Sequence, residues 1–274
     1  MAQTENKLRI PETLRKVKNI VGIFSAKGGV GKSAISLQIA LALKEKGFKV
    51  GLVDADIYGP SQPVMLNSSA GELQLTQDKI IEPLKKEGIK FISMGLISNE
   101  KMPVIWRGPM VSGAVMQLLS QTDWGELDFL IVDTPPGTGD VQLTLLQRIP
   151  LTSSIVVTTP QKVAISDCKK GIEMINKLNL PISGLIENMS WFQPDDSEKR
   201  YYLFGKNGGK ELSKEYSLDL LAQLPLVELG EDSDIQNNPL LQKEFDKISD
   251  KLTASIKLLK ENKSTGIPQI NINK

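Results

Sequence analysis

One stretch of the chain, residues 25–33 with the sequence Ser-Ala-Lys-Gly-Gly-Val-Gly-Lys-Ser, constrains the fold more than any other. An apolar run over residues 20–24 precedes it, and a helix-forming run over residues 34–43 follows it. Glycines let main-chain N–H groups turn toward phosphate oxygens where a Cβ would collide. The first helical turn adds unpaired N–H groups and the positive end of the helix dipole. Strand, loop and helix in this order therefore predict a phosphate-binding loop.

Two side chains of this loop have different expected roles. Lys32 can reach the β- and γ-phosphates, and the Ser33 hydroxyl can coordinate Mg²⁺. An ordinary glycine-rich turn is the alternative, but Lys-Gly-Gly-x-Gly-Lys-Ser arises by chance in a chain of this length with a probability of roughly a few in 100,000. Ala26 stands where the general pattern has its first glycine, and it fits if its φ is negative. The main chain is expected to bind nucleotide through Ala26, Gly28, Gly29, Val30 and Gly31.

The composition is that of an ordinary globular protein and fits one large α/β domain. The chain has 274 residues, of which 40% are hydrophobic and 24% are charged, and its net charge is +1. A nearly balanced charge gives no electrostatic footprint for nucleic acid or for an anionic membrane. The chain contains no apolar run of 18 residues, so no membrane span is expected. Residues 1–7 lack the apolar core of a signal peptide. We expect neither nucleic acid nor membrane as a partner.

The chain has no histidine and a single cysteine, Cys168. This excludes Ser-His and Cys-His nucleophile pairs and histidine-ligated metals. One cysteine also excludes a disulfide within the chain and suits a reducing, cytoplasmic setting. We interpret Cys168 as a small core residue. Phosphoryl transfer remains available, because it depends mainly on positioning and electrostatics.

Two acidic residues end the second apolar run, Lys-Val-Gly-Leu-Val-Asp-Ala-Asp, over residues 49–56. Ligands of open α/β sheets bind at the carboxyl edge of the strands. Asp54 is therefore a candidate for orienting or activating the attacking water, and Asp56 is a candidate switch residue. A helix cap or a solvated turn remains the alternative for both.

Further candidates follow later strands. Asp133 ends the run Asp-Phe-Leu-Ile-Val-Asp and is expected to hold Mg²⁺ directly or through water. Gly137 can offer its N–H to the γ-phosphate and sense its loss. Asn188 ends another apolar run, and its amide suits the edge of a purine, with a turn-forming asparagine as the alternative. Arg107 either lies near phosphates or a partner subunit, or is a surface residue while Trp106 fills the core.

The order of apolar and helical runs predicts the fold class. We expect an α/β three-layer sandwich of the P-loop NTPase type, with a mostly parallel twisted sheet of about seven or eight strands and helices on both faces. Residues 1–18 are an N-terminal arm, residues 19–261 form the ATPase domain, and residues 262–274 are a flexible tail. A helical apolar stripe near the C-terminus is expected to dock on the sheet; it consists of Phe245, Ile248, Leu252, Ile256 and Leu259.

The motifs together resemble the Mrp/ApbC family of iron–sulfur cluster carrier ATPases. The extra lysine near the start of the loop, Lys27, resembles the deviant P-loop of the MinD, ParA and nitrogenase iron protein class. The other matching segments lie within about residues 19–230 and are Asp54–Ser61, Trp106–Met110, Asp133–Asp140 and Glu187–Ser190.

The resemblance implies an ATP-dependent homodimer that hydrolyses ATP to ADP and phosphate with Mg²⁺. Lys27 would reach across the interface to the partner's nucleotide, so that hydrolysis is tied to dimer geometry. Asp54 would position water, Asp133 would support the metal, and Asn188 would contact adenine. The implied role is assembly of iron–sulfur clusters or their transfer, with scaffolds or apoproteins as partners.

One departure from the family pattern concerns the cluster. Family members usually place Cys-x-x-Cys between the Asn-Met-Ser and Tyr-x-Phe-Gly segments, and two subunits share a 4Fe–4S cluster through these thiolates. Here Pro194 and Ser197 occupy the corresponding positions, and neither supplies a thiolate. The ATPase part of the resemblance therefore transfers residue by residue, and the cluster-binding part does not.

Two other function classes stay open at this stage. A MinD- or ParA-like protein would use ATP to switch dimerisation and positioning without a cluster, although the chain has neither a basic amphipathic tail nor a basic surplus for DNA. A small-molecule kinase or ligase built on the same loop would need an acceptor substrate.

Overall fold

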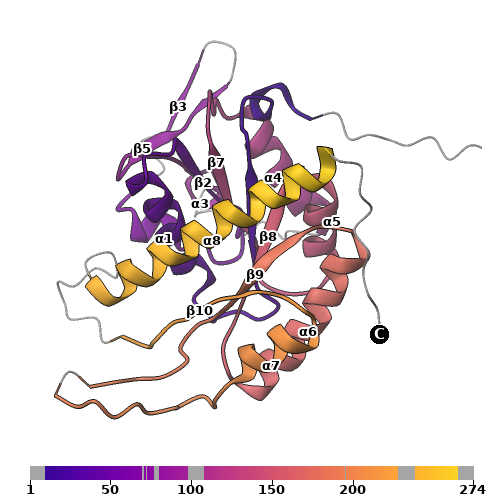
Figure 1. Cartoon of the computed structure of the whole chain (residues 1–274). Coiled ribbons are helices and arrows are strands. Elements are labelled where there is room, and N and C mark those ends of the chain that lie inside the picture. Colours follow the sequence, from indigo (N-terminus) through magenta and orange to yellow (C-terminus); the bar gives the residue numbers. More distant parts are fainter. Residues whose placement is uncertain are drawn as a thin grey trace, which may run out of the picture.

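The computed structural model describes residues 10–69, 71, 73–76, 80–97, 108–194, 196–227 and 238–264. Within these ranges, eight strands form one sheet (Figure 1). In chain order they are β1 (Ile20–Phe24), β2 (Val50–Asp54), β5 (Leu84–Lys86), β6 (Ile89–Ser93), β7 (Phe129–Asp133), β8 (Ser153–Thr158), β9 (Ile182–Glu187) and β10 (Leu220–Gln223).

The strand order in the sheet is β10-β9-β8-β1-β7-β2-β6-β5. All neighbouring pairs are parallel except β5 and β6, which form an antiparallel hairpin at one edge. A separate antiparallel pair joins β3 (Gln74–Leu75) and β4 (Ile81–Glu82). Since β1 lies in the middle, between β7 and β8, the loop that follows it opens at the centre of the carboxyl edge, where ligands of such sheets bind.

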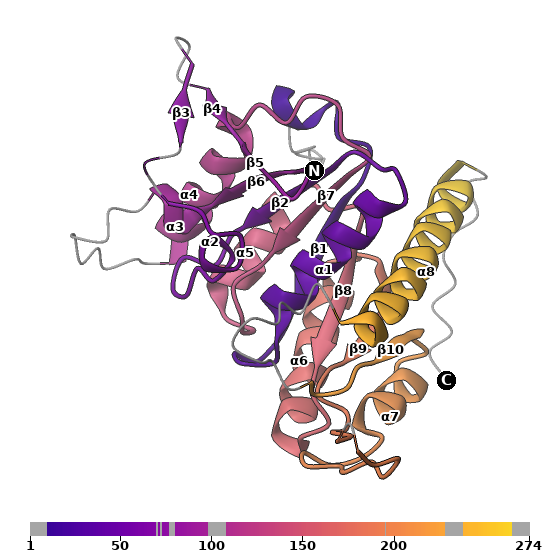
Figure 2. The same cartoon turned by 90° about the vertical axis from the view of Figure 1, so that its left-hand side faces the viewer.

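Helices cover both faces of the sheet (Figures 1 and 2). The helices on the first face, α1 and α8, lie side by side. Helices α4, α5 and α6 cover the second face, with α7 beside α6. The helices are α1 (Lys32–Glu45), α2 (Gln62–Met65), α3 (Met94–Ile97), α4 (Gly108–Gln121), α5 (Asp140–Arg148), α6 (Lys162–Lys177), α7 (Gly208–Glu215) and α8 (Pro239–Ser264), with one 3-10 turn at Glu12–Leu14.

The central strands are apolar on both sides because both faces are covered. In β1, Val21 and Ile23 pack toward α1 and α8, whereas Ile20 and Phe24 pack toward the helices of the second face. All five residues of β1 are buried. This alternation within a continuous apolar run is what a parallel sheet between two helical layers requires.

The expected three-layer fold with seven or eight strands is confirmed. Apolar residues of the C-terminal stripe, including Phe245 and Ile248, are buried against α1 and the sheet as expected. The helix that carries Cys168 is α6, which begins at Lys162. Trp106 and Arg107 lie outside the described residues, so their two interpretations stay predictions.

The domain boundaries at residues 18 and 261 also remain predictions. Near the N-terminal one, Leu14 and Val17 are buried on the second face, and at the other end α8 continues to Ser264. No helix in the described ranges has the length and apolar character needed to cross a membrane.

Candidate functional site

The phosphate loop joins the end of β1 to the start of α1. Gly29 and Gly31 have φ values of 77° and 83°, which favour glycine. Ala26 is not among the residues with positive φ, so an alanine fits where the general pattern has glycine. Gly28 and Gly29 are exposed. A Cβ added to Gly29 would meet nothing within 4 Å, so glycine is favoured here by the backbone conformation and not by crowding.

Asn188 lies directly against this loop. Its Nδ2 donates a hydrogen bond to the carbonyl oxygen of Val30 at 2.9 Å. A Cβ on Gly31 would collide with the same amide group. The asparagine that follows β9 thus holds the loop that follows β1, although 158 residues separate Asn188 from Val30. Its predicted contact with adenine remains a prediction.

A buried ion pair lies beneath the loop. Nζ of Lys32 pairs with Oδ1 of Asp133, and these side chains are 5% and 0% exposed. The same carboxylate oxygen accepts a hydrogen bond from Oγ of Ser36 at 3.2 Å. Burying two charges is costly unless they are paired and hydrogen-bonded. Each buried group is thus partnered, at the position where the sequence predicts phosphate and Mg²⁺.

Asp54 forms a second buried carboxylate at the same edge of the sheet. Its Oδ2 accepts a hydrogen bond from Oγ of Ser93 at 2.9 Å, and its Oδ1 accepts one from the N–H of Asp56 at 3.1 Å. Burial, together with the negative charge of Asp133, raises the pKa of Asp54 from 3.8 to about 7, while the Ser93 hydrogen bond opposes the shift. The adjacent strands β2 and β7 pair Asp54 directly with Asp133.

The sequence did not identify Gln62, which connects these two carboxylates. Its Nε2 donates to Oδ2 of Asp133 at 3.1 Å and to the carbonyl oxygen of Ser33 at 2.8 Å. Its main-chain N–H donates to Oδ2 of Asp54 at 3.3 Å. The signal in the sequence was a polar residue just before a proline in the segment that follows the two acids. Such a pattern predicts only a turn, so the contacts of Gln62 are visible only in the folded structure.

The two predicted switch residues, Asp56 and Gly137, both make hydrogen bonds with main-chain groups. Oδ1 of Asp56 accepts hydrogen bonds from the N–H groups of Tyr58 and Gly59, both at 3.2 Å. The N–H of Gly137 donates to the carbonyl oxygen of Ser25 at 2.9 Å. Gly137 must therefore give up this bond before its N–H can contact a γ-phosphate. The switch roles stay predictions.

Lys27 is held less firmly than Lys32. Its Nζ lies 3.4 Å from Oε1 of Gln161, the residue before α6, and its side chain is half-buried. A long cationic side chain with one weak contact can turn outward toward a second molecule, as the resemblance requires of Lys27.

The chain's own groups fit Mg²⁺ and a nucleotide. Gly28 and Gly29 are exposed in the loop, Lys32 pairs with Asp133 at its base, and Gln62 joins Asp133 to the main chain of Ser33. Mg²⁺ usually keeps several waters and binds through a hydroxyl or carboxylate together with substrate phosphates. Ser33 and Asp133 would hold the ion, which would neutralise phosphate charge when bound.

The segment where family members carry cysteines is a projecting excursion over residues 191–207, which follows β9 and precedes α7 (Figure 1). Main-chain hydrogen bonds pair Phe192 with Tyr201 at 2.8 and 2.7 Å, and Ser197 donates its N–H to the carbonyl of Pro194 at 3.2 Å. The residues at the cysteine positions thus form a turn without thiolates. They do not fit a cluster held by cysteine.

Cys168 does not replace the missing pair. It is 1% exposed and lies on α6 in an apolar cluster. Burial raises the pKa of its thiol to about 12, and a hydrogen bond with Thr158 opposes this only in part. A protonated, buried thiol is neither a nucleophile nor a metal ligand. Cys168 is therefore the core residue that the sequence predicts.

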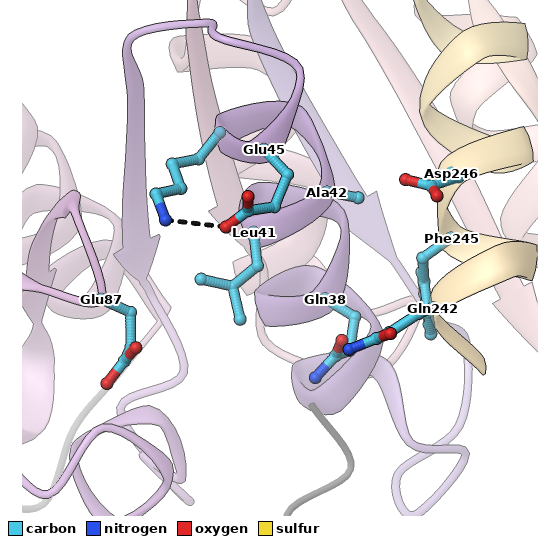
Figure 3. A pocket seen from close by; sticks show the side chains of 9 residues that line it. Gln38, Leu41, Ala42, Glu45, Glu87, Gln242, Phe245 and Asp246 are labelled. Atoms are coloured by element: carbon cyan, nitrogen blue, oxygen red, sulfur yellow. Dashed lines mark hydrogen bonds and ion pairs between the residues drawn. The ribbon is translucent and has the colours of Figure 1, made fainter. Parts of the chain in front are cut away.

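A separate cavity of about 390 Å³ lies between α1 and the start of α8 (Figure 3). Carboxylates of Glu45, Glu87 and Asp246 surround it, and Nζ of Lys44 is paired with Glu45 at 2.7 Å. This negative lining opposes phosphate binding. The strand-end site, with its glycine loop and Lys32, therefore remains the predicted nucleotide site.

Comparison with known proteins identifies a family. The family model for ParA-type NUBPL iron-transfer P-loop NTPases matches residues 16–259. An iron–sulfur cluster carrier protein of Pseudomonas fragi is 47% identical over 223 residues, which cover 81% of this chain and 78% of that protein. The iron–sulfur cluster transfer protein NUBPL of Dictyostelium discoideum is 41% identical, and the match covers 93% of this chain and 83% of the relative.

Some relatives are longer than this chain. The match spans 66% of the carrier protein of Synechocystis and 60% of that of Aquifex aeolicus.

Solved structures agree with the fold. A nucleotide-binding protein of Archaeoglobus fulgidus in complex with ADP has a TM-score of 0.69 and 30% identity, over 88% of this chain and 90% of that one. The cell division ATPase MinD of Pyrococcus furiosus has a TM-score of 0.55 and 18% identity, over 87% and 99% of the two chains, which supports the fold alone.

Proposed function

The chain belongs to the family of NUBPL iron-transfer P-loop NTPases, and we propose that it acts as a homodimeric ATPase that promotes transfer of iron–sulfur clusters to apoproteins. The observation that carries the ATPase part is the buried pair of Lys32 and Asp133 beneath a glycine loop at the centre of the sheet edge. Paired charges in a dry site act strongly on phosphate charge.

The residues of the site have distinct tasks in this proposal. Lys32 would turn from Asp133 to the β- and γ-phosphates. Ser33 and Asp133 would hold Mg²⁺ directly or through water, and the bound ion would neutralise phosphate charge. Asp54 orients the attacking water from the neighbouring strand, and Lys27 from the second subunit adds positive charge at the transferred phosphoryl group. Hydrolysis then requires the dimer.

The iron–sulfur cluster is cargo in this proposal, and the chain supplies no cysteine pair to hold it. The family relationship supports a role in cluster transfer, whereas Pro194 and Ser197 argue against carriage on thiolates of the excursion. The ATP-driven dimer would therefore act on a scaffold or an apoprotein that provides the thiolates. A single buried cysteine agrees with a reducing, cytoplasmic setting.

Two measurements test the proposal. Purified protein should hydrolyse ATP only with Mg²⁺, and sedimentation velocity should show a dimer with a non-hydrolysable ATP analogue. Lys27→Ala should keep nucleotide affinity within a few-fold but lose the ATP-dependent dimer, because Lys27 makes one weak contact within its own subunit. A monomer at all nucleotide states, or a Lys27→Ala variant that still dimerises, would contradict the dimer mechanism.

The cluster-transfer part needs its own assay. A cluster-loaded scaffold and a cysteine-bearing apoprotein are mixed under anaerobic conditions, and acquisition of the cluster is followed by visible absorption. The protein with Mg²⁺–ATP should accelerate transfer, and Lys32→Ala should not. Equal rates in both would leave a MinD- or ParA-like positioning protein as the better proposal, which binding to liposomes and to DNA would then examine.

A further inference from the structure

Gln62 carries an oxygen atom that its surroundings leave without a partner. The residue begins α2, and its side chain is 0% exposed. Oε1 is buried and accepts no hydrogen bond from any described group. Buried side-chain oxygens are almost always hydrogen-bonded, and an unsatisfied one in a native protein requires an explanation.

The orientation of this carboxamide is fixed by its other half. Nε2 has two hydrogens, and both of its partners are acceptors, namely Oδ2 of Asp133 and the carbonyl oxygen of Ser33. A flipped amide would place Oε1 against these two oxygens and lose both hydrogen bonds. Oε1 therefore keeps its position, and the missing donor must come to it.

No neighbouring group identified at the site can be that donor. Asp54 already accepts hydrogen bonds from Ser93, from the N–H of Asp56 and from the N–H of Gln62 itself, and it makes no contact with Oε1. The oxygens of Asp133 are taken by Lys32, Ser36 and Nε2 of Gln62. Lys32 is paired with Asp133 and is required at the phosphates. A water molecule can donate to Oε1, and Mg²⁺–nucleotide brings ordered waters to the base of the loop.

We propose that Gln62 is a positioning residue for Mg²⁺–nucleotide, with Oε1 accepting a hydrogen bond from a water of the loaded site while Nε2 holds Asp133. This rests on the proposed ATPase function and adds to it a residue that determines the Mg²⁺ requirement. Lys32 and Ser36 occupy Oδ1 of Asp133, and Gln62 occupies Oδ2. When Lys32 departs, Ser36 still holds Oδ1 and Gln62 still holds Oδ2, so Gln62 is the group that fixes the second oxygen of this carboxylate.

The same residue links the metal side of the site to the water side. Its side chain contacts Asp133 and Ser33, and its main chain contacts Asp54. A shift of the carboxamide on Mg²⁺ binding would therefore move the first residue of α2 relative to Asp54. Exchange of the side chain breaks the link to the metal side and leaves the main-chain bond to Asp54 intact.

The test compares Gln62→Met with the wild-type protein. Methionine keeps the length and nearly the volume of glutamine but has no amide. Binding of a fluorescent ATP analogue is measured as a function of Mg²⁺ concentration, and again with a chelator present. Loss of hydrogen bonds to a charged group should raise the Mg²⁺ concentration for half-maximal binding roughly tenfold, with binding in the chelator unchanged within about twofold.

Gln38→Met is the matched control. Gln38 is also a buried glutamine, 6% exposed, but it lines the cavity between α1 and α8 (Figure 3). Its exchange should leave the Mg²⁺ dependence at the wild-type value. If the methionine variant does not fold, Gln62→Asn replaces it, because asparagine keeps the amide but is one methylene shorter. This variant should also raise the Mg²⁺ concentration for half-maximal binding.

The outcomes separate this inference from the proposed function. Wild-type protein that binds no nucleotide at any Mg²⁺ concentration overturns the proposed ATPase. Wild-type binding with Mg²⁺ together with a Gln62 variant of lowered thermal midpoint and unchanged Mg²⁺ dependence overturns only the role of Gln62, because a purely structural residue behaves in that way.

Discussion

The predicted nucleotide site and the excursion over residues 191–207 both follow the carboxyl ends of strands, yet they are built differently. In the nucleotide site, Lys32, Asp54 and Asp133 are buried, and their contacts come from separate strands and helices. In the excursion, Tyr201, Tyr202 and Leu203 are 41%, 40% and 60% exposed. One site is fixed by the fold, whereas the other is a surface feature.

The charges of the two regions are also used differently. Lys32 is enclosed and paired with a carboxylate. In the excursion the cations lie over aromatic rings, with Arg200 4.5 Å from the ring centroid of Trp191 and Lys206 4.5 Å from that of Tyr202. Exposed contacts of this kind are weak, about 0.5–1 kcal/mol each. We therefore expect substitutions of the buried residues at the strand ends to have larger effects than substitutions in the excursion.

Lys32→Ala should have the largest effect. Loss of the amine removes the phosphate contact, so ATP hydrolysis should fall at least about 100-fold. It also leaves Asp133 as an unpaired buried carboxylate, which should destabilise the protein by about 3–5 kcal/mol in chemical unfolding. The double variant Lys32→Ala, Asp133→Asn should recover much of this stability but no hydrolysis. Equal stabilities of the single and double variants would contradict the assignment of the pair.

A gain of function can be built in the excursion. Wild-type protein should take up no stoichiometric 4Fe–4S cluster on anaerobic reconstitution, because Pro194 and Ser197 offer no thiolate. The double variant Pro194→Cys, Ser197→Cys should acquire iron, sulfide and visible absorption, since it places two thiolates on one turn, where both positions are half-buried. Cys168→Ser should change neither result. A stoichiometric cluster in the wild-type protein would show that ligands outside the cysteine positions suffice.

Asp54→Asn removes the ionisable group of this position and nearly keeps its size, so it tests the raised pKa of Asp54. The pKa of Asp54 is raised to about 7 in the folded state, so the native protein keeps a proton that the unfolded chain has lost above pH 4. The wild-type protein therefore loses stability between about pH 4 and pH 7, by about 2–4 kcal/mol. The uncharged variant lacks this loss, so its thermal midpoint relative to wild type should rise from pH 5 to pH 8. If the difference in thermal midpoint between the variant and the wild-type protein does not change with pH, the pKa of Asp54 is not raised.

Arg200→Gln should have the smallest effect. It removes an exposed cation–π contact to Trp191 and an exposed 3.3 Å hydrogen bond from Nε to Oε1 of Gln193, so the local stability of the excursion should fall by about 0.5–1 kcal/mol. Hydrogen exchange at Phe192 and Tyr201, whose N–H groups pair across the excursion, should accelerate by about two- to five-fold. Nucleotide affinity should not change. A loss of nucleotide binding would show that the two regions are coupled.

The sequence by itself determined the parts of this protein that depend on local pattern. The glycine loop, the strand before it and the helix after it predict a phosphate site because each requires only neighbouring residues. The position of Asp54 and Asp133 at strand ends also follows, since apolar runs that stop at an acid place it at the carboxyl edge. The missing cysteines are readable from Pro194 and Ser197 alone.

Only the tertiary structure decided which of these residues meet. The hydrogen bond from Asn188 to Val30 and the contact from Gln62 to Asp133 join residues 158 and 71 positions apart. Local preference carries no information about such pairs, because they form only when the order of strands in the sheet brings separate loops to one edge. Burial then raises the pKa of Asp54 and leaves Oε1 of Gln62 without a partner, and both effects arise from packing that no single segment specifies.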